Sequence, residues 1–164
     1  MTTPDWEERV AAAWATFDER TDDENRALIE SLAAELPADS AVASFERACV
    51  FDSTDASDLA VPLYQEALAR GLPVGRRRRA VIQLASSLRN IGRADESVAL
   101  LTDELGAASD ELDDAVRAFL ALALTDVGRE RDAVSQALTA LGPHLPRYQR
   151  SLGAYARALV DDVG

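Results

Sequence analysis

Few residues of this 164-residue sequence carry the side chains that nucleophilic or acid–base catalysis requires. The single histidine, His144, lies between two prolines in the turn-forming stretch 142–146. The single cysteine, Cys49, lies in a helical pattern with no histidine near it in sequence. These settings favour a solvated turn histidine and a small buried cysteine that fills a core. We therefore expect no catalytic residue, no metal site and no cofactor.

Paired acids could in principle bind a metal ion or act together as acid and base. They occur at residues 22–23, 113–114 and 161–162. The first two pairs lie where helices are expected to begin, and each negative charge there is stabilised by the helix dipole by about 0.3–1 kcal/mol. This structural role explains them, and the glycines fall singly, without a phosphate-binding loop. An enzyme is only a remote alternative.

Residues 76–79 are four consecutive arginines in the expected first turn of a helix, where positive charge is disfavoured. Something acidic should compensate them. One explanation is internal and uses acids of the following unit: Asp110, Glu111, Asp113 and Asp114. The other explanation is an acidic binding partner.

The overall charge narrows the classes of partner and compartment. The chain has 29 acids and 17 bases, all of them arginine, and a net charge of −12. This charge repels phosphate backbones, so we expect no nucleic-acid partner. No apolar run reaches the roughly 18 residues of a membrane span, and residues 1–8 lack the pattern of a signal peptide. A cytoplasmic protein without a membrane partner is expected.

The positions of these residues depend on helices that repeat along the chain. Leucines recur at positions 32, 68, 105 and 141, and alanines at positions 12, 48, 85 and 121. Leu-Pro pairs begin at positions 36, 72 and 145, and Gly-Arg pairs at positions 92 and 128. These markers share a spacing of 36 or 37 residues, and the last two Leu-Pro pairs are two such periods apart. This period is typical of a solenoid built from helix pairs. The fold class that this period predicts is all-α, an α-solenoid.

Apolar residues with i, i+3, i+4, i+7 spacing predict two helices in each period. We expect helices over residues 5–20, 22–36, 40–53, 56–70, 75–91, 93–105, 110–127, 129–141 and 147–162. Thr21 and Glu24 have capping-box spacing, so Thr21 should open the second helix. Gly71, Gly92, Gly106 and Gly142 are expected to close helices.

These residues resemble the tetratricopeptide repeat family, whose repeat is a helix–turn–helix of about 34 residues. The leucine, small residue and later bulky residue of that repeat are similar to Leu84, Ala85 and Leu88, and to Leu120, Ala121 and Leu124. Its second helix is similar to this sequence at Ala60, Tyr64, Ala67 and Ala133. Ser97 and Arg47 depart from the pattern, and the first unit matches it poorly.

The resemblance implies one repeat domain over residues 1–164, with units at about 5–37, 40–73, 76–109 and 110–146 and a capping helix over 147–162. It also implies a non-catalytic scaffold that binds a protein or peptide on the concave face formed by the first helix of each pair. The basic residues of the carboxylate-clamp pattern of this family are absent, because Phe45, Ile82 and Ala118 occupy their places.

Aligning the first helices on the recurring alanines predicts which side chains share that concave face. The groove candidates are Arg9, Phe45, Arg79, Ile82, Arg89 and Leu122, with Trp6 beside them and Arg150 and Arg157 added from the last helix. Arginine with aromatic and aliphatic residues suits an acidic or amphipathic protein or peptide segment. Two alternatives remain: the arginines pair within the fold, or the chain forms a homodimer through an exposed helix face.

Overall fold

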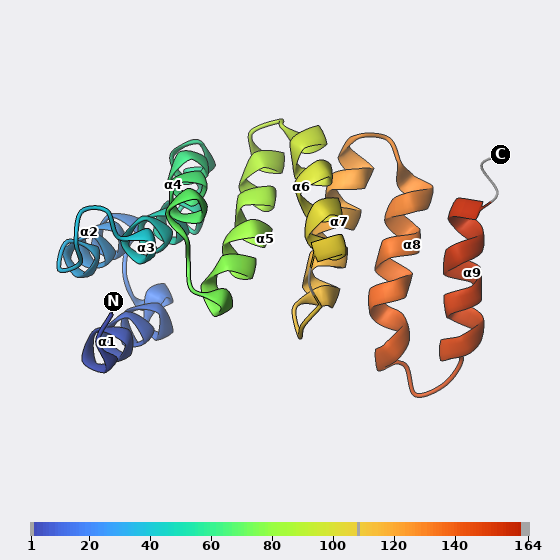
Figure 1. Cartoon of the computed structure of the whole chain (residues 1–164), viewed down its shortest axis with the longest axis horizontal. Coiled ribbons are helices and arrows are strands. Elements are labelled where there is room, and N and C mark those ends of the chain that lie inside the picture. The colour runs from blue at the N-terminus through green and yellow to red at the C-terminus, as the bar shows by residue number, and fades with distance from the viewer. Residues whose placement is uncertain (1, 108, 162–164) are drawn as a thin grey trace. The chain divides into compact units, whose positions relative to one another are not determined.

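The computed structural model describes residues 2–107 and 109–161, and within them the chain forms nine α-helices and two 3₁₀ helices (Figure 1). The α-helices are α1 (Pro4–Ala15), α2 (Asp22–Ala33), α3 (Ala41–Asp52), α4 (Ser57–Arg70), α5 (Val74–Asn90), α6 (Ala94–Ala107), α7 (Asp113–Asp126), α8 (Glu130–Leu141) and α9 (Gln149–Asp161). The 3₁₀ helices are η1 (Phe17–Glu19) and η2 (Gly142–His144). Successive helices pack in antiparallel pairs, and the predicted all-α fold class is confirmed.

Side-chain caps explain where the first helices begin. The Thr3 hydroxyl accepts from the Trp6 amide, and Ser40 opens α3 in the same way. At α2 the predicted capping box is present: Thr21 accepts from the Glu24 amide, and the Glu24 carboxylate accepts from the Thr21 amide at 2.8 Å. Each cap satisfies amide groups that have no partner inside the helix.

Glycine follows the end of three helices as predicted. Gly71 follows α4 with φ +86°, and Gly92 follows α5 with φ +79°, a left-handed conformation that glycine adopts without a Cβ penalty. Gly142 directly follows Leu141, the last residue of α8, and is right-handed because the chain continues into η2. One predicted stop differs, because Gly106 lies inside the last turn of α6.

Several predicted helix bounds differ from the structure, and two of them have a clear local cause. The first helix was expected to reach residue 20, but it ends at Ala15, and the Thr16 hydroxyl donates to the Ala12 carbonyl at 2.9 Å. The last helix was expected to begin at residue 147. It begins at Gln149, because Tyr148 has φ +70° and cannot continue a right-handed helix. Asp162, in the third acid pair, lies outside the described residues.

The chain divides into two compact units, Met1–Ser87 and Leu88–Gly164. In the first unit, α1 and α2 share a core that also receives Val50 from α3. Trp6, expected on the concave face, is 2% exposed in this core, where its indole donates to the Leu32 carbonyl at 2.8 Å. The pair α3 and α4 buries the rings of Phe45 and Tyr64, whose centroids lie 6.2 Å apart.

In the second unit, α7 packs against both α6 and α8, and α9 packs against α8. Leu101 of α6, Val116 of α7 and Ala156 of α9 are fully or almost fully buried. These contacts give every helix of this unit at least one covered side. The apolar stripes read from the sequence therefore identify the faces that pack.

The recurring alanines have two different environments. Ala48 and Ala85 have 0% exposure and Ala121 has 9%, as expected for positions where helices approach closely. Ala12 is exposed, so the register does not extend to α1 in this respect. The first helix packs on α2, and Ala12 lines an open hollow between these two helices, where it stays exposed.

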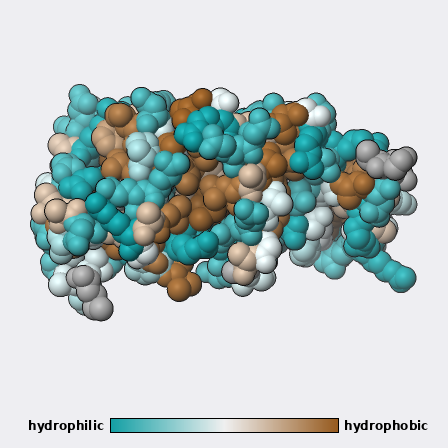
Figure 2. All heavy atoms as spheres, turned by 45° about the horizontal axis from the view of Figure 1, so that its top comes forward, coloured by the Kyte–Doolittle hydropathy of each residue, from teal (hydrophilic) through white to brown (hydrophobic). Residues whose placement is uncertain are grey.

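None of the helices in the described ranges is both long and apolar enough to cross a membrane. The face shown in Figure 2 has hydrophobic patches between larger hydrophilic areas. Exposed large hydrophobic residues include Leu59 and Val74 in the first unit, and Leu122, Val134, Tyr148 and Tyr155 in the second unit.

Candidate partner-binding site

The first unit contains a hollow of about 550 Å³ between the first helices of its pairs, which we call the first-unit groove. It is lined by Glu7, Val10, Ala11, Trp14 and Ala15 of α1, Glu46 of α3, and Arg76 and Arg79 of α5. Apolar and aromatic groups thus come from α1, and charged groups face them from α3 and α5. This composition suits a segment that has both apolar and charged side chains.

One wall of the groove is a fixed network of charges. Arg76 donates to both Glu7 oxygens, at 3.1 and 2.6 Å, and to Glu46 at 3.3 Å. The second Glu46 oxygen accepts from the Trp14 indole at 2.9 Å. Hydrogen bonding from Arg76 lowers the pKa of the Glu7 carboxyl below its ordinary value. Arg76 is therefore neutralised within the fold and holds α1, α3 and α5 together.

Arg79 lies one turn further along α5 and has a different environment. Its guanidinium carbon lies 5.6 Å from the centroid of the Phe45 ring, a cation–π contact. In the described ranges, no carboxylate lies within ion-pair distance of Arg79, and the residue is exposed. A planar guanidinium held in place by an aromatic ring can pair with an incoming carboxylate at little entropic cost.

The second unit has a hollow of its own, about 600 Å³ in volume, which we call the second-unit hollow. Arg117 of α7 and Arg157 of α9 line it together with Gln136 of α8. Arg117 donates to the Gln136 amide oxygen at 2.8 Å. Among the described residues, no carboxylate lines this hollow, so it too is suited to a group with negative charge.

Three groove candidates of the first unit do not present a free binding group. Arg9 is held by Asp5 at 3.0 Å and by both oxygens of Glu35 at 2.6 Å, on the side of α1 that faces α2. Phe45 is 1% exposed and Ile82 is 6% exposed, so both belong to the core. The apolar side chains that were assigned to the groove are therefore covered by neighbouring helices.

The candidates of the second unit differ among themselves. Arg89 is half-buried and forms an ion pair with Asp126 of α7. Leu122 is 47% exposed on α7 but does not line the second-unit hollow. Arg150 lies at a shallow hollow at the start of α9, and Arg157 lines the second-unit hollow. Of the eight candidates, Arg79 and Arg157 therefore line the two larger hollows.

The first residue of the arginine run, Arg76, differs from its sequence-based interpretation. The partners of Arg76 come from the preceding helices α1 and α3, not from residues 110–114. Glu46 and Trp14, which complete the network, were absent from the sequence-based site. The sequence contained a signal for Glu46, because this acid lies three residues after Ala43 and four before Val50, on one stripe of the helix. In the structure that stripe is buried, and Glu46 is 4% exposed.

The residues considered for catalysis occupy separate places. Burial raises the pKa of Cys49 to about 12, so the thiol is a poor nucleophile at neutral pH. His144 is exposed in η2, with Nε2 2.8 Å from Asp114. In the described part of the chain, no three His, Cys, Asp or Glu side chains are grouped to hold a metal ion.

Comparison with known proteins agrees with this geometry. A family model of the tetratrico peptide repeat matches residues 41–159, and the chain belongs to the tetratricopeptide repeat family. Among solved structures, the chain named MamA MSR-1 C2 is similar, with a TM-score of 0.60 and 18% identity over 99% of this chain and 83% of that one. That likeness shows the fold. No curated protein matches the chain.

The family that the sequence resembles is therefore confirmed, including the α-solenoid class. Proteins built from this repeat generally mediate protein–protein interactions, and they are typically non-catalytic scaffolds.

Proposed function

We propose that this chain is a non-catalytic scaffold that binds an acidic or amphipathic protein segment in the first-unit groove. The observation that carries the proposal is Arg79, an exposed guanidinium at the groove that lies over the Phe45 ring and has no carboxylate within ion-pair distance among the described residues. In a chain of net charge −12, an arginine without an acidic partner is unexpected.

The bound segment should combine an acid with an apolar side chain. The acid would pair with Arg79, and the apolar group would lie against Val10, Ala11 and Trp14 of α1. Arg76 is held by Glu7 and Glu46, so it shapes the wall and leaves Arg79 as the recognition group.

A peptide-display selection on the whole chain tests the proposal. Peptides selected on the wild type should be enriched in acids next to apolar residues. Arg79→Glu should weaken their binding about tenfold or more, because a charge-assisted hydrogen bond contributes about 1.5–3 kcal/mol and 1.4 kcal/mol is a factor of ten. Binding should also weaken with salt, as the Debye length falls below about 10 Å.

Arg131→Glu is the matched control, since Arg131 of α8 is an exposed arginine that lines neither of the two larger hollows. It should leave the selected peptides bound with unchanged affinity. Peptides that bind Arg79→Glu as tightly as the wild type would contradict the proposal. Thermal melting of both variants reports whether either change affects the fold.

A further inference from the structure

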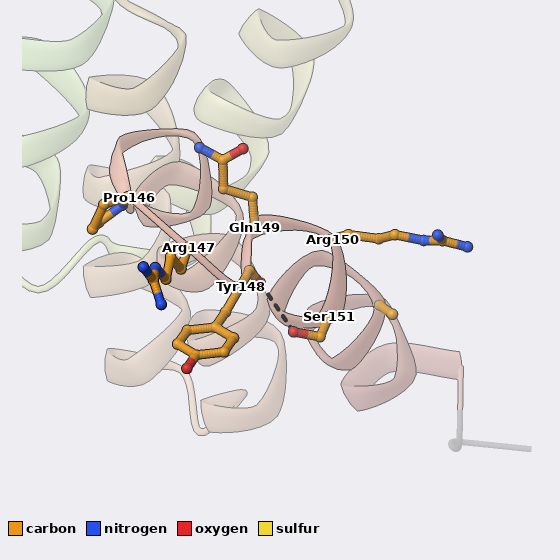
Figure 3. A pocket seen from close by; sticks show the side chains of 7 residues that line it. Pro146, Arg147, Tyr148, Gln149, Arg150 and Ser151 are labelled. Atoms are coloured by element: carbon orange, nitrogen blue, oxygen red, sulfur yellow. Dashed lines mark hydrogen bonds between the residues drawn. The ribbon is translucent and has the colours of Figure 1, made fainter.

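Only one side of α9, the last described helix, is covered by other helices. It packs on α8 and η2, and Ala156 is the one buried residue among its described positions. Tyr148 is 77% exposed and Tyr155 is 69% exposed. A hollow of about 470 Å³ lies at the start of this helix, lined by residues 146–151 and Ala154 (Figure 3). Tyrosine rings exposed to this extent are typical of surfaces that bind another protein.

This surface is also positively charged. Between Asp132 and Asp161 the sequence has no acid. In the described structure, no carboxylate lies within ion-pair distance of Arg147 or Arg150. Figure 3 shows Arg150 and the Tyr148 ring extending to opposite sides of the start of α9, so they flank the exposed face that carries Ser151 and, one turn later, Tyr155. We call Arg147, Tyr148, Arg150, Ser151 and Tyr155 the α9 surface.

The other end of the sequence has the complementary properties. A hollow of about 430 Å³, the α1–α2 hollow, lies between the first two helices. Its apolar lining is Ala12, Ala13, Leu28 and Leu32. Among the described residues, several acids of this helix pair and its loop have no ion-pair partner: Glu8, Asp18, Glu19, Asp22 and Asp23.

The basic residues at the rim of the α1–α2 hollow do not cancel this charge. Arg9 is held by Asp5 and Glu35. Arg20 donates to Asn25 at 2.9 Å and to the Thr16 hydroxyl at 2.8 Å. The acids of α1 and α2 therefore remain available to a cationic partner.

We propose that the α9 surface of one copy binds the α1–α2 hollow of a second copy. Tyr155 enters the apolar hollow, and Arg147 and Arg150 face carboxylates of the first two helices. Because two different surfaces meet, each bound copy leaves one end free, and association continues or closes into a ring. Symmetric contact between two α9 surfaces is disfavoured because arginine would face arginine. This interface is separate from the first-unit groove and does not depend on the proposed function.

The test uses two variants of the full chain, each with one altered end. The first variant carries Arg150→Ser and Tyr155→Ser, which remove charge and ring from the α9 surface. The second carries Glu8→Arg and Ala12→Arg, which place like charge at the α1–α2 hollow. All four positions are exposed, so the fold should be kept, and circular dichroism and melting temperature check this. Light scattering coupled to size exclusion measures mass against concentration.

The wild type should exceed the mass of one chain as its concentration rises, and 0.5 M NaCl should reduce this association. Each variant alone should stay monomeric, whereas a 1:1 mixture should form a dimer, because each variant retains the end that the other lacks. Val134→Ser, which removes a 47% exposed side chain from α8, should associate like the wild type. A monomeric wild type at all concentrations, unchanged association of either variant, or a mixture that stays monomeric would each overturn the proposal.

Discussion

Glu7 and Arg76 lie 69 residues apart in the sequence and join α1 to α5 through two parallel hydrogen bonds. The same guanidinium reaches Glu46, whose side chain is only 5% exposed. One arginine of a four-residue run thus neutralises acids from two other helices. Because the carboxylate of Glu46 is buried, its negative charge must be stabilised by its partners, Arg76 and the Trp14 indole.

Arg76→Gln should therefore destabilise the chain. It leaves a buried carboxylate without its cation, and we expect a loss of about 2 kcal/mol, below the value for a fully buried pair because Glu7 is partly exposed. For a chain of this size the melting temperature should fall by about 4–8 °C. Arg79→Gln is the control, with an expected loss below about 1 kcal/mol, the cation–π contact. Equal melting temperatures for the two variants would show that the network is not stabilising.

The contribution of Glu7 to the free energy of unfolding should depend on pH. Hydrogen bonds from Arg76 lower the pKa of Glu7 in the folded chain, so the ionised form is favoured there. The resulting stability is fully present above the unfolded-state pKa of about 4.3 and is lost as the pH falls through the lower folded-state pKa. Urea unfolding should show wild type more stable than Glu7→Gln at pH 7, with a difference that shrinks below about pH 4. In the Arg76→Gln background this pH-dependent difference should be absent.

Ala85→Leu should overpack a helix crossing. Ala85 has 0% exposure, so the added methyl and methylene groups must displace neighbours, and we expect a loss of about 1–3 kcal/mol. Ala12, at the corresponding position of α1, is exposed, so Ala12→Leu should change the free energy of unfolding by less than about 0.5 kcal/mol. Denaturant unfolding of both variants measures the difference. A neutral Ala85→Leu would mean that the crossing tolerates a larger side chain than its burial indicates.

The helices could be predicted from sequence because their signals are local. A period of 3.6 residues, a capping box at Thr21 and a left-handed glycine at Gly92 each depend on a few neighbouring residues. The same local signals recur in each repeat, and their consistent spacing identified the family. The errors fall where a local signal was overridden, as at Gly106, which a continuing helix absorbed.

The binding site was less predictable because exposure and pairing depend on distant residues. Arg9 was placed in the groove by its register, yet Glu35 of α2 neutralises it. Phe45 belongs to the correct helix, but α4 buries its ring against Tyr64. Arg79 lines the groove and, among the described residues, has no carboxylate within ion-pair distance, which depends on side chains from other helices. No single-helix pattern distinguishes Arg79 from Arg76.

Two glycines of the second unit should respond to alanine in opposite directions. Gly92 has φ +79°, where a Cβ is strained although no atom lies within 4 Å of it, so Gly92→Ala should cost about 1 kcal/mol. Gly106 lies within α6, and an added Cβ meets nothing within 4 Å. Because alanine favours the helix and restricts the unfolded chain, Gly106→Ala should stabilise by about 0.5–1 kcal/mol. Chemical unfolding of the two variants measures both signs. A stabilising Gly92→Ala would contradict the left-handed stop after α5, and a destabilising Gly106→Ala would contradict the helical assignment of residue 106.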